Sequence, residues 1–134
     1  MATRSPEPRW LGRVVVDAIH NDQLREHGGL PGIRDENVLV SALARPQQKW
    51  RYAEEPDVAA LAAAYGFGLV KNHPYRDGNK RIGLLAIATF LGINGYDPRA
   101  TDADVVTQIL ALADNRVSEA ELADWIRTRS TKRK

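Results

Sequence analysis

The sequence contains no cysteine among its 134 residues, which excludes disulfide bonds and thiolate metal ligands. It also lacks any apolar run close to the roughly 20 residues that span a bilayer, and its first ten residues lack the apolar stretch of a signal peptide. These absences are typical of proteins in the reducing cytoplasm. We therefore expect a cytoplasmic protein that has no membrane partner and is stabilised by side-chain packing.

Length and composition indicate one globular domain. A chain of 134 residues lies within the usual size of a single domain. With 43% hydrophobic and 27% charged residues, it is far from the low hydrophobicity and high charge that cause disorder. We expect one domain over residues 1–134, with residues 1–9 and 128–134 as flexible tails.

The net charge of +2 depends on the C-terminal end of the chain. Five of the 19 basic residues lie in the final eight positions, and without them 14 basic residues stand against 17 acidic ones. A basic terminal run is usually a solvated end that keeps a protein soluble. Because no zinc-finger pattern, RNP aromatic motif or reading helix accompanies the run, we expect no direct nucleic-acid partner.

Periodicity over residues 10–26 predicts an amphipathic first helix that ends at "HGGLPG". His20 is expected on the surface of this helix, and His27 in the turn that follows it. The apolar residues expected to form its inward face are Leu11, Val14, Val15, Ala18, Ile19 and Leu24.

A second, shorter helix is expected between Asp35, a suitable N-cap, and Pro46, which would end it. The residues that follow have no helical stripe. In residues 45–52 the aromatic side chains Trp50 and Tyr52 alternate with other residues, which permits a short strand or flap.

Two segments are apolar almost all round and predict buried central helices: residues 57–71 and residues 82–93. Two further helices are expected over residues 101–115 and 118–129. Thr101 is an N-cap candidate for the first, and Ser118 begins a capping box in the second. The chain is therefore expected to be an all-α bundle of about six helices.

The stretch "HPYRDGNKR", residues 73–81, separates the two apolar segments and concentrates polar groups there. Gly78 to Arg81 open the second central helix, and a helix N-terminus offers free N–H groups and a partial positive charge. Lys80 and Arg81 are unfavourable in such a first turn unless an anion binds there. Gly78 would let a phosphate approach the backbone closely.

His73 and Asp77 add groups that suit phosphate chemistry. An imidazole can accept a proton from an attacking hydroxyl, and a single carboxylate can hold Mg²⁺ when phosphates complete its coordination. Each residue alone also has an ordinary interpretation, because a histidine before proline is often a turn residue, Asp-Gly is a turn signal, and lysine and arginine are often solvated. Their combination at one helix start predicts a phosphate site.

These residues resemble the signature of the Fic/Doc superfamily, written H-P-F-x-D-G-N-G-R in Fic proteins. Lys80 stands where Fic proteins have glycine, and N-K-R is the form found in Doc, the death-on-curing toxins of toxin–antitoxin pairs. Two other stretches, "HGGLPGIRDENVLVSALARPQ" and "ATFLGINGY", are also similar to Doc proteins. The resemblance extends from about Val14 to Ile126.

The resemblance implies an activity and roles for the motif residues. Fic proteins generally transfer AMP from ATP to a hydroxyl, whereas Doc toxins transfer the γ-phosphate to a threonine of the translation factor EF-Tu. By similarity, His73 would be the general base and Asp77 would position the hydroxyl and Mg²⁺. The residues implied in binding phosphates are Gly78, Asn79, Lys80 and Arg81.

Lys80 and Leu84 favour phosphorylation over AMP transfer. Lys80 is bulky where a Fic protein opens a second phosphate pocket, and Leu84 stands where Fic proteins carry another arginine. Pro74 and Gly78 are Fic-like, so AMP transfer stays open as an alternative. A catalytically silent, antitoxin-binding module is a third possibility.

The resemblance also implies a partner and a flap. We find no [S/T]-x-x-x-E-[G/N] inhibitory motif, so inhibition is expected from a cognate antitoxin whose disordered segment folds on the toxin. Residues 45–52 fall where the superfamily places the flap that aligns the target protein. Within them, Trp50 is expected to anchor the core rather than to contact the target.

Overall fold

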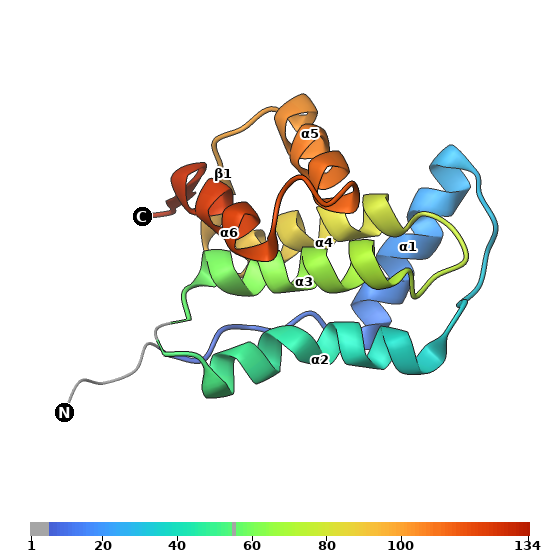
Figure 1. Ribbon diagram of the computed structural model, residues 1–134, viewed down its shortest axis with the longest axis horizontal. Coiled ribbons are helices and arrows are strands. Elements are labelled where there is room, and N and C mark those ends of the chain that lie inside the picture. Colours follow the sequence, from blue (N-terminus) through green and yellow to red (C-terminus); the bar gives the residue numbers. More distant parts are fainter. Residues whose placement is uncertain (1–5, 55) are drawn as a thin grey trace.

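The computed structural model describes residues 6–54 and 56–134, and this part of the chain forms six helices and a small two-stranded sheet (Figure 1). The prediction of an all-α bundle is confirmed. The elements are α1 (Arg13–His27), α2 (Glu36–Tyr52), α3 (Val58–Asn72), α4 (Asn79–Ile93), β1 (Tyr96–Pro98), α5 (Asp102–Ala113), α6 (Glu119–Thr128) and β2 (Ser130–Lys132).

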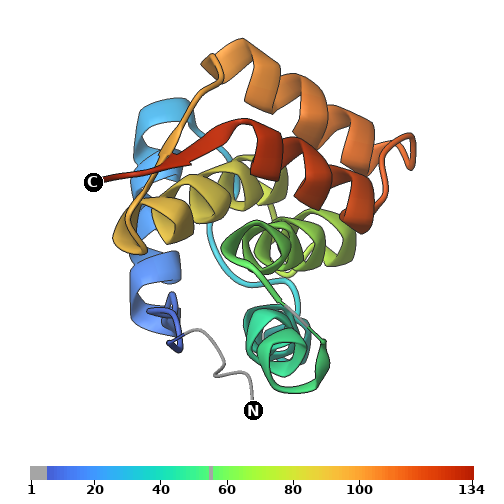
Figure 2. The ribbon, with the colours of Figure 1, turned by 90° about the vertical axis from the view of Figure 1, so that its left-hand side faces the viewer.

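Helix α3 is the centre of the bundle, as its apolar sequence predicts, and α2, α4, α5 and α6 all pack against it. Figure 2 shows α3 nearly end-on, with α2 on one side and α4 and α6 on the other. Glycines bring α3 and α4 close together. A Cβ atom at Gly66 would lie 2.6 Å from Ile87, and one at Gly83 would lie 2.5 Å from Val70. This close contact fixes where the loop between α3 and α4 emerges.

The N-caps predicted at Asp35, Thr101 and Ser118 are confirmed, and Asp57 caps α3 in the same way. Asp35 and Asp57 accept hydrogen bonds from Val38 N–H and Ala60 N–H and thereby cap α2 and α3. Thr101 and Ser118 each form a complete capping box at the start of α5 and α6.

The predicted end of α2 at Pro46 is wrong, because the helix continues through this residue to Tyr52. Pro46 is buried within the helix, and the following turn is held by the carboxylate of Glu119 on α6, which accepts bonds from Arg45 and Lys49. Tertiary contacts therefore outweigh the helix-breaking tendency of proline. The flap predicted over residues 45–52 is absent, since this segment is helical.

The inward face predicted for α1 is right in part: Leu11 is buried and Ile19 packs against the core, but Val14 and Val15 point outward. Val14 is 81% exposed and Val15 is 46% exposed, whereas Val16 and His20 are buried. The spacing of apolar residues does not show which face of α1 is buried, because the buried face includes His20, whose partners lie far away in the sequence. His20 is thus a buried residue and not the surface residue that its polarity suggested.

The C-terminal end has partners in the fold. Strand β2 pairs antiparallel with β1, which places Tyr96 opposite Lys132. Arg133 donates to the carboxylate of Asp97 and to the carbonyl of Gly92. No helix within residues 6–54 and 56–134 is both long and apolar enough to cross a membrane.

Candidate phosphate-binding site

The motif forms the loop that joins α3 to α4 at one end of the bundle (Figure 1). His73 ends α3 in the left-handed conformation, with φ 50° and ψ 59°, and Gly78 precedes α4 with φ 78°. Left-handed backbone stops helix α3 without a long connection. His73 and Gly78 therefore reverse the backbone and turn the chain from one buried helix into the next.

An extended segment, residues 29–35, lies beside the loop and binds its backbone. Pro74 O accepts hydrogen bonds from Arg34 N–H at 2.8 Å and Asp35 N–H at 3.1 Å, and Gly32 O accepts one from Arg76 N–H at 3.1 Å. Ile33 and Tyr75 form an antiparallel bridge between them. The strand-like pairing beside the motif is thus made by this segment and not by residues 45–52.

Asn79 closes the loop from inside. Its buried side chain accepts Tyr75 N–H at 3.0 Å and donates to Tyr75 O at 2.9 Å. Both ends of the amide are therefore used within the loop. The amide nitrogen keeps a second hydrogen, and the backbone N–H of Asn79 belongs to the first turn of α4.

Tyr75 anchors the loop to α1. Its buried hydroxyl donates to Asp17 at 2.6 Å, and Asp17 in turn accepts a bond from Arg13, which also pairs with Glu36 at the start of α2. Burial, together with the bond to Asp17, raises the pKa of Tyr75 well above its ordinary value. The phenol therefore stays neutral and holds the loop as a donor.

The N-terminus of α4 is open. Its first intrahelical bond runs from Ile82 N–H to Gly78 O at 2.9 Å, and no side chain caps it. The N–H groups of Asn79, Lys80 and Arg81 precede this bond. Lys80 and Arg81 are exposed and make no ion pair with the described residues. Three N–H groups and two unpaired cations thus form a site for an anion.

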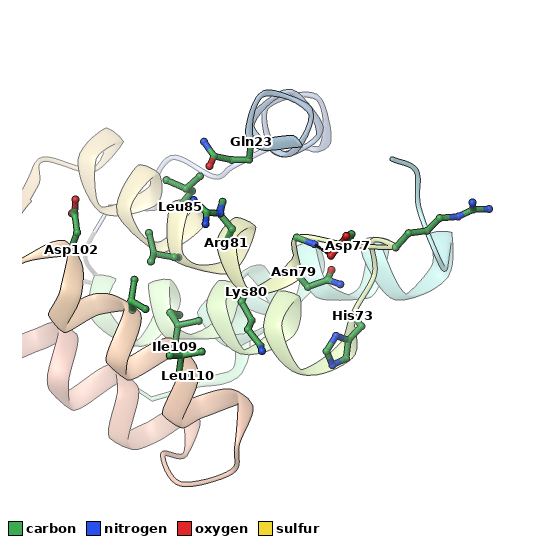
Figure 3. A pocket seen from close by; sticks show the side chains of 14 residues that line it. Gln23, His73, Asp77, Asn79, Lys80, Arg81, Leu85, Asp102, Ile109 and Leu110 are labelled. Atoms are coloured by element: carbon green, nitrogen blue, oxygen red, sulfur yellow. Dashed lines mark hydrogen bonds between the residues drawn. The ribbon is translucent and has the colours of Figure 1, made fainter. Parts of the chain in front are cut away.

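A cavity of about 700 Å³ opens at this helix end, and its size is typical of small-molecule sites. Figure 3 shows His73 at one side of the cavity and the apolar side chains of α4 and α5 at the other. The six predicted site residues all line it, namely His73, Asp77, Gly78, Asn79, Lys80 and Arg81. The apolar lining comes from Leu84, Leu85, Val106, Ile109 and Leu110. The structure therefore brings the predicted residues together, while their chemical roles stay predictions.

Asp77 fits a site for a divalent cation shared with phosphates. Its Oδ1 accepts Gly78 N–H at 3.0 Å and its Oδ2 accepts Leu30 N–H at 3.2 Å, so each oxygen keeps a free lone pair. No group of three His, Cys, Asp or Glu side chains that could hold a metal occurs in the described chain. A Mg²⁺ ion here would therefore depend on Asp77 and the nucleotide, which is the usual arrangement for this ion.

Sequence reasoning missed Arg34 and Gly29, which support the motif from outside it. Arg34 binds the carbonyls at the end of α3. Gly29 has φ 126°, and a Cβ atom there would lie 3.0 Å from Oδ2 of Asp77. A glycine pair signals only a turn, and an arginine with distant partners leaves no local pattern.

The comparisons with known proteins agree with this geometry. The model of the Fic/DOC family matches residues 10–91, which include the segment before α2 and the whole motif loop. A protein named "Protein kinase doc" from Escherichia phage P1 is 29% identical over 123 residues, covering 89% of this chain and 94% of that protein. A "Toxin Doc" from Mycolicibacterium smegmatis is 42% identical over 79 residues, covering 58% of this chain and 60% of that protein.

The fold and the site define a helical protein with a cavity at the loop that joins its two central helices. This chain belongs to the Fic/DOC family, and its relatives with Doc names support the Doc type that the N-K-R sequence indicates.

Proposed function

We propose that the protein is a Doc-type toxin that transfers the γ-phosphate of ATP to a serine or threonine hydroxyl of a translation factor similar to EF-Tu. The observation that carries this proposal is the start of α4, where Lys80 and Arg81 line the cavity with His73 and form no ion pair with any described residue. Such a helix start is unfavourable without an anion. The names of the two Doc relatives support the same conclusion.

Each motif residue has a role in this proposal. His73 is exposed at the cavity and accepts the proton of the target hydroxyl. Lys80, Arg81 and the N–H groups of the first turn hold the phosphates, and Gly78 lets them approach the backbone. Asp77 positions the hydroxyl and would hold Mg²⁺, which would neutralise charge on the phosphates.

The two sides of the cavity support γ-phosphate transfer. In the view of Figure 3, His73 lies at one side, Ile109 and Leu110 of α5 lie at the other, and Lys80 lies between them, while Arg81 extends toward Leu85 of α4. A nucleotide with its base on the apolar side would direct its terminal phosphate toward His73. Leu84 belongs to the apolar lining and offers no second cation for a reversed phosphate chain.

AMP transfer to a protein hydroxyl is the second candidate, because Pro74 and Gly78 agree with the Fic signature. Incubating the purified protein with bacterial lysate and either γ-labelled or α-labelled ATP separates the two reactions. We expect a protein to be labelled from γ-labelled ATP alone. Labelling from α-labelled ATP would establish AMP transfer instead.

We also propose that a cognate antitoxin inhibits the protein through a disordered segment that folds on it, in the cytoplasm where the translation factor is found. The remaining alternative is a silent module that binds an antitoxin without catalysis. If neither label marks a protein while the chain still binds ATP and Mg²⁺, the silent module is the better description.

A further inference from the structure

His20 is a buried polar residue outside the motif. Within residues 6–54 and 56–134, His20 and Asn79 are the buried polar or charged side chains, with His20 only 2% exposed. Asn79 is explained by its two bonds to Tyr75. His20 lies on α1, more than 50 residues before the loop in sequence, and it does not belong to the signature.

Its contacts are with three residues of the motif loop. The Nε2 atom lies 2.7 Å from the carbonyl oxygen of Asp77. Because a carbonyl can only accept, the imidazole must carry a proton on Nε2. The ring stacks on Tyr75 with centroids 3.7 Å apart and planes inclined by 13°, and a Cβ atom at Gly78 would lie 3.4 Å from Nε2.

These contacts fix the peptide that begins the phosphate site. The carbonyl held by His20 belongs to the peptide between Asp77 and Gly78, and the N–H of this peptide donates to Oδ1 of Asp77. Rotation of the peptide would therefore move the carboxylate as well as the backbone that leads into α4. Nothing else among the described residues bonds to the Asp77 carbonyl.

We propose that His20 is a positioning residue for phosphate transfer, which aims the carboxylate of Asp77 and the start of α4 at the nucleotide. This inference rests on the proposed function. The positioning depends on the donor at Nε2, which holds the carbonyl of Asp77, whereas the flat ring packs on Tyr75. Phenylalanine keeps only the ring, and glutamine keeps only the donor.

The test compares His20→Phe and His20→Gln with the wild type, and uses Asn21→Ala, at an exposed position on the same helix, as the control. Unfolding by urea establishes that each variant folds. We expect His20→Phe to lower kcat roughly ten- to hundred-fold with little change in KM for the target protein, because small misplacements cost about that much. His20→Gln should stay within about three-fold of the wild type.

A folded His20→Phe variant with the kcat of the wild type would overturn the proposal, as would equal losses in both variants. If the wild type transfers no phosphate, the proposed function fails, and NMR then decides the role of His20. The hydrogen-exchange rate of the Gly78 backbone amide, measured by NMR, should rise in His20→Phe and stay near the wild type in His20→Gln, because the peptide held by His20 also directs this N–H to Asp77. An unchanged exchange rate in His20→Phe would refute the inference.

Discussion

Arg34 donates two hydrogen bonds to the end of α3: its Nε lies 2.5 Å from the carbonyl oxygen of His73, and its Nη2 lies 2.7 Å from that of Asn72. These carbonyls have no partner within the helix, and His73 itself has the unfavourable φ of 50°. The guanidinium therefore offsets the cost of a left-handed histidine. It holds the backbone of the residue that we propose as the general base.

Replacing Arg34 should impair transfer more than folding. Arg34→Ala removes both bonds, but water can then donate to the two exposed carbonyls. We therefore expect the free energy of unfolding to fall by only about 1 kcal/mol. The rate should fall roughly ten-fold or more, because the imidazole is no longer held in place. Arg34→Lys should not restore the rate, since an ammonium cannot reproduce the planar fork.

The measurements are kcat for γ-phosphate transfer and unfolding by urea, with Arg116→Ala as a control at an exposed arginine outside the cavity. A variant of Arg34 that loses stability but keeps the rate of the wild type would show that the contact is structural alone.

His73→Ala should abolish both transfer and toxicity. Removal of a general base typically costs 10² to 10⁴ in rate, about 3 to 5 kcal/mol in activation free energy. The side chain is exposed, so the variant should unfold at nearly the same urea concentration as the wild type. Growth of cells expressing each form measures the effect. Equal growth arrest by both forms would show that catalysis does not cause the toxicity.

Much of the fold was predictable because the sequence features that indicate helix starts and buried helices are local. The caps at Asp35, Thr101 and Ser118 depend on neighbours three residues away, and the apolar sequences of α3 and α4 indicate central helices. The errors came from distant partners. Glu119 on α6 keeps α2 helical beyond Pro46, and no pattern within α2 shows this.

The candidate site was predictable to the extent that its residues lie in one loop. His73 and the start of α4 are close in sequence, so the motif alone places them together. The residues that orient the loop, His20, Arg34 and Asp17, come from α1 and the segment before α2. Their roles appear only when the chain is folded.

The stability that Glu119 contributes should depend on pH. Burial alone would raise the pKa of this carboxyl, but hydrogen bonds from Lys49 and Arg45 outweigh burial and hold the pKa below its ordinary value of 4.5. A carboxyl with a lowered folded-state pKa stabilises the fold above its unfolded pKa, and this stability is lost as the pH falls through the folded pKa. Glu119→Gln should therefore cost about 1 to 3 kcal/mol at pH 7 and progressively less below about pH 4.5.

Urea unfolding of Glu119→Gln and the wild type between pH 3 and pH 7 measures this difference. Glu121→Gln is unsuitable as a control because Glu121 belongs to a capping box, whereas Glu54→Gln changes an exposed carboxyl just after α2. A difference that stays constant across the pH range would contradict the ion-pair explanation.

Deleting residues 130–134 should lower stability and leave the cavity intact. The deletion removes β2 and the bonds of Arg133 to Asp97 and Gly92, none of which contribute to the cavity. We expect a lower melting temperature with unchanged affinity for ATP, measured by calorimetry at a temperature where both forms are folded. Weaker ATP binding by the folded, truncated protein would indicate that the basic end takes part in the site.

Reversing the charge of Lys80 should both increase the free energy of unfolding and weaken nucleotide binding. A cation in the first turn of α4 opposes the helix dipole, so Lys80→Glu should increase the free energy of unfolding by about 0.5 to 1 kcal/mol at low salt, and less at high salt. The same change at Arg51, in the last turn of α2, should decrease it, because cations are favourable there. Lys80→Glu should weaken ATP binding at least ten-fold, about 1.4 kcal/mol, while Arg51→Glu leaves it unchanged.

Urea unfolding at two salt concentrations and calorimetry with ATP test both effects. If Lys80→Glu binds ATP as tightly as the wild type, the start of α4 does not hold the phosphates.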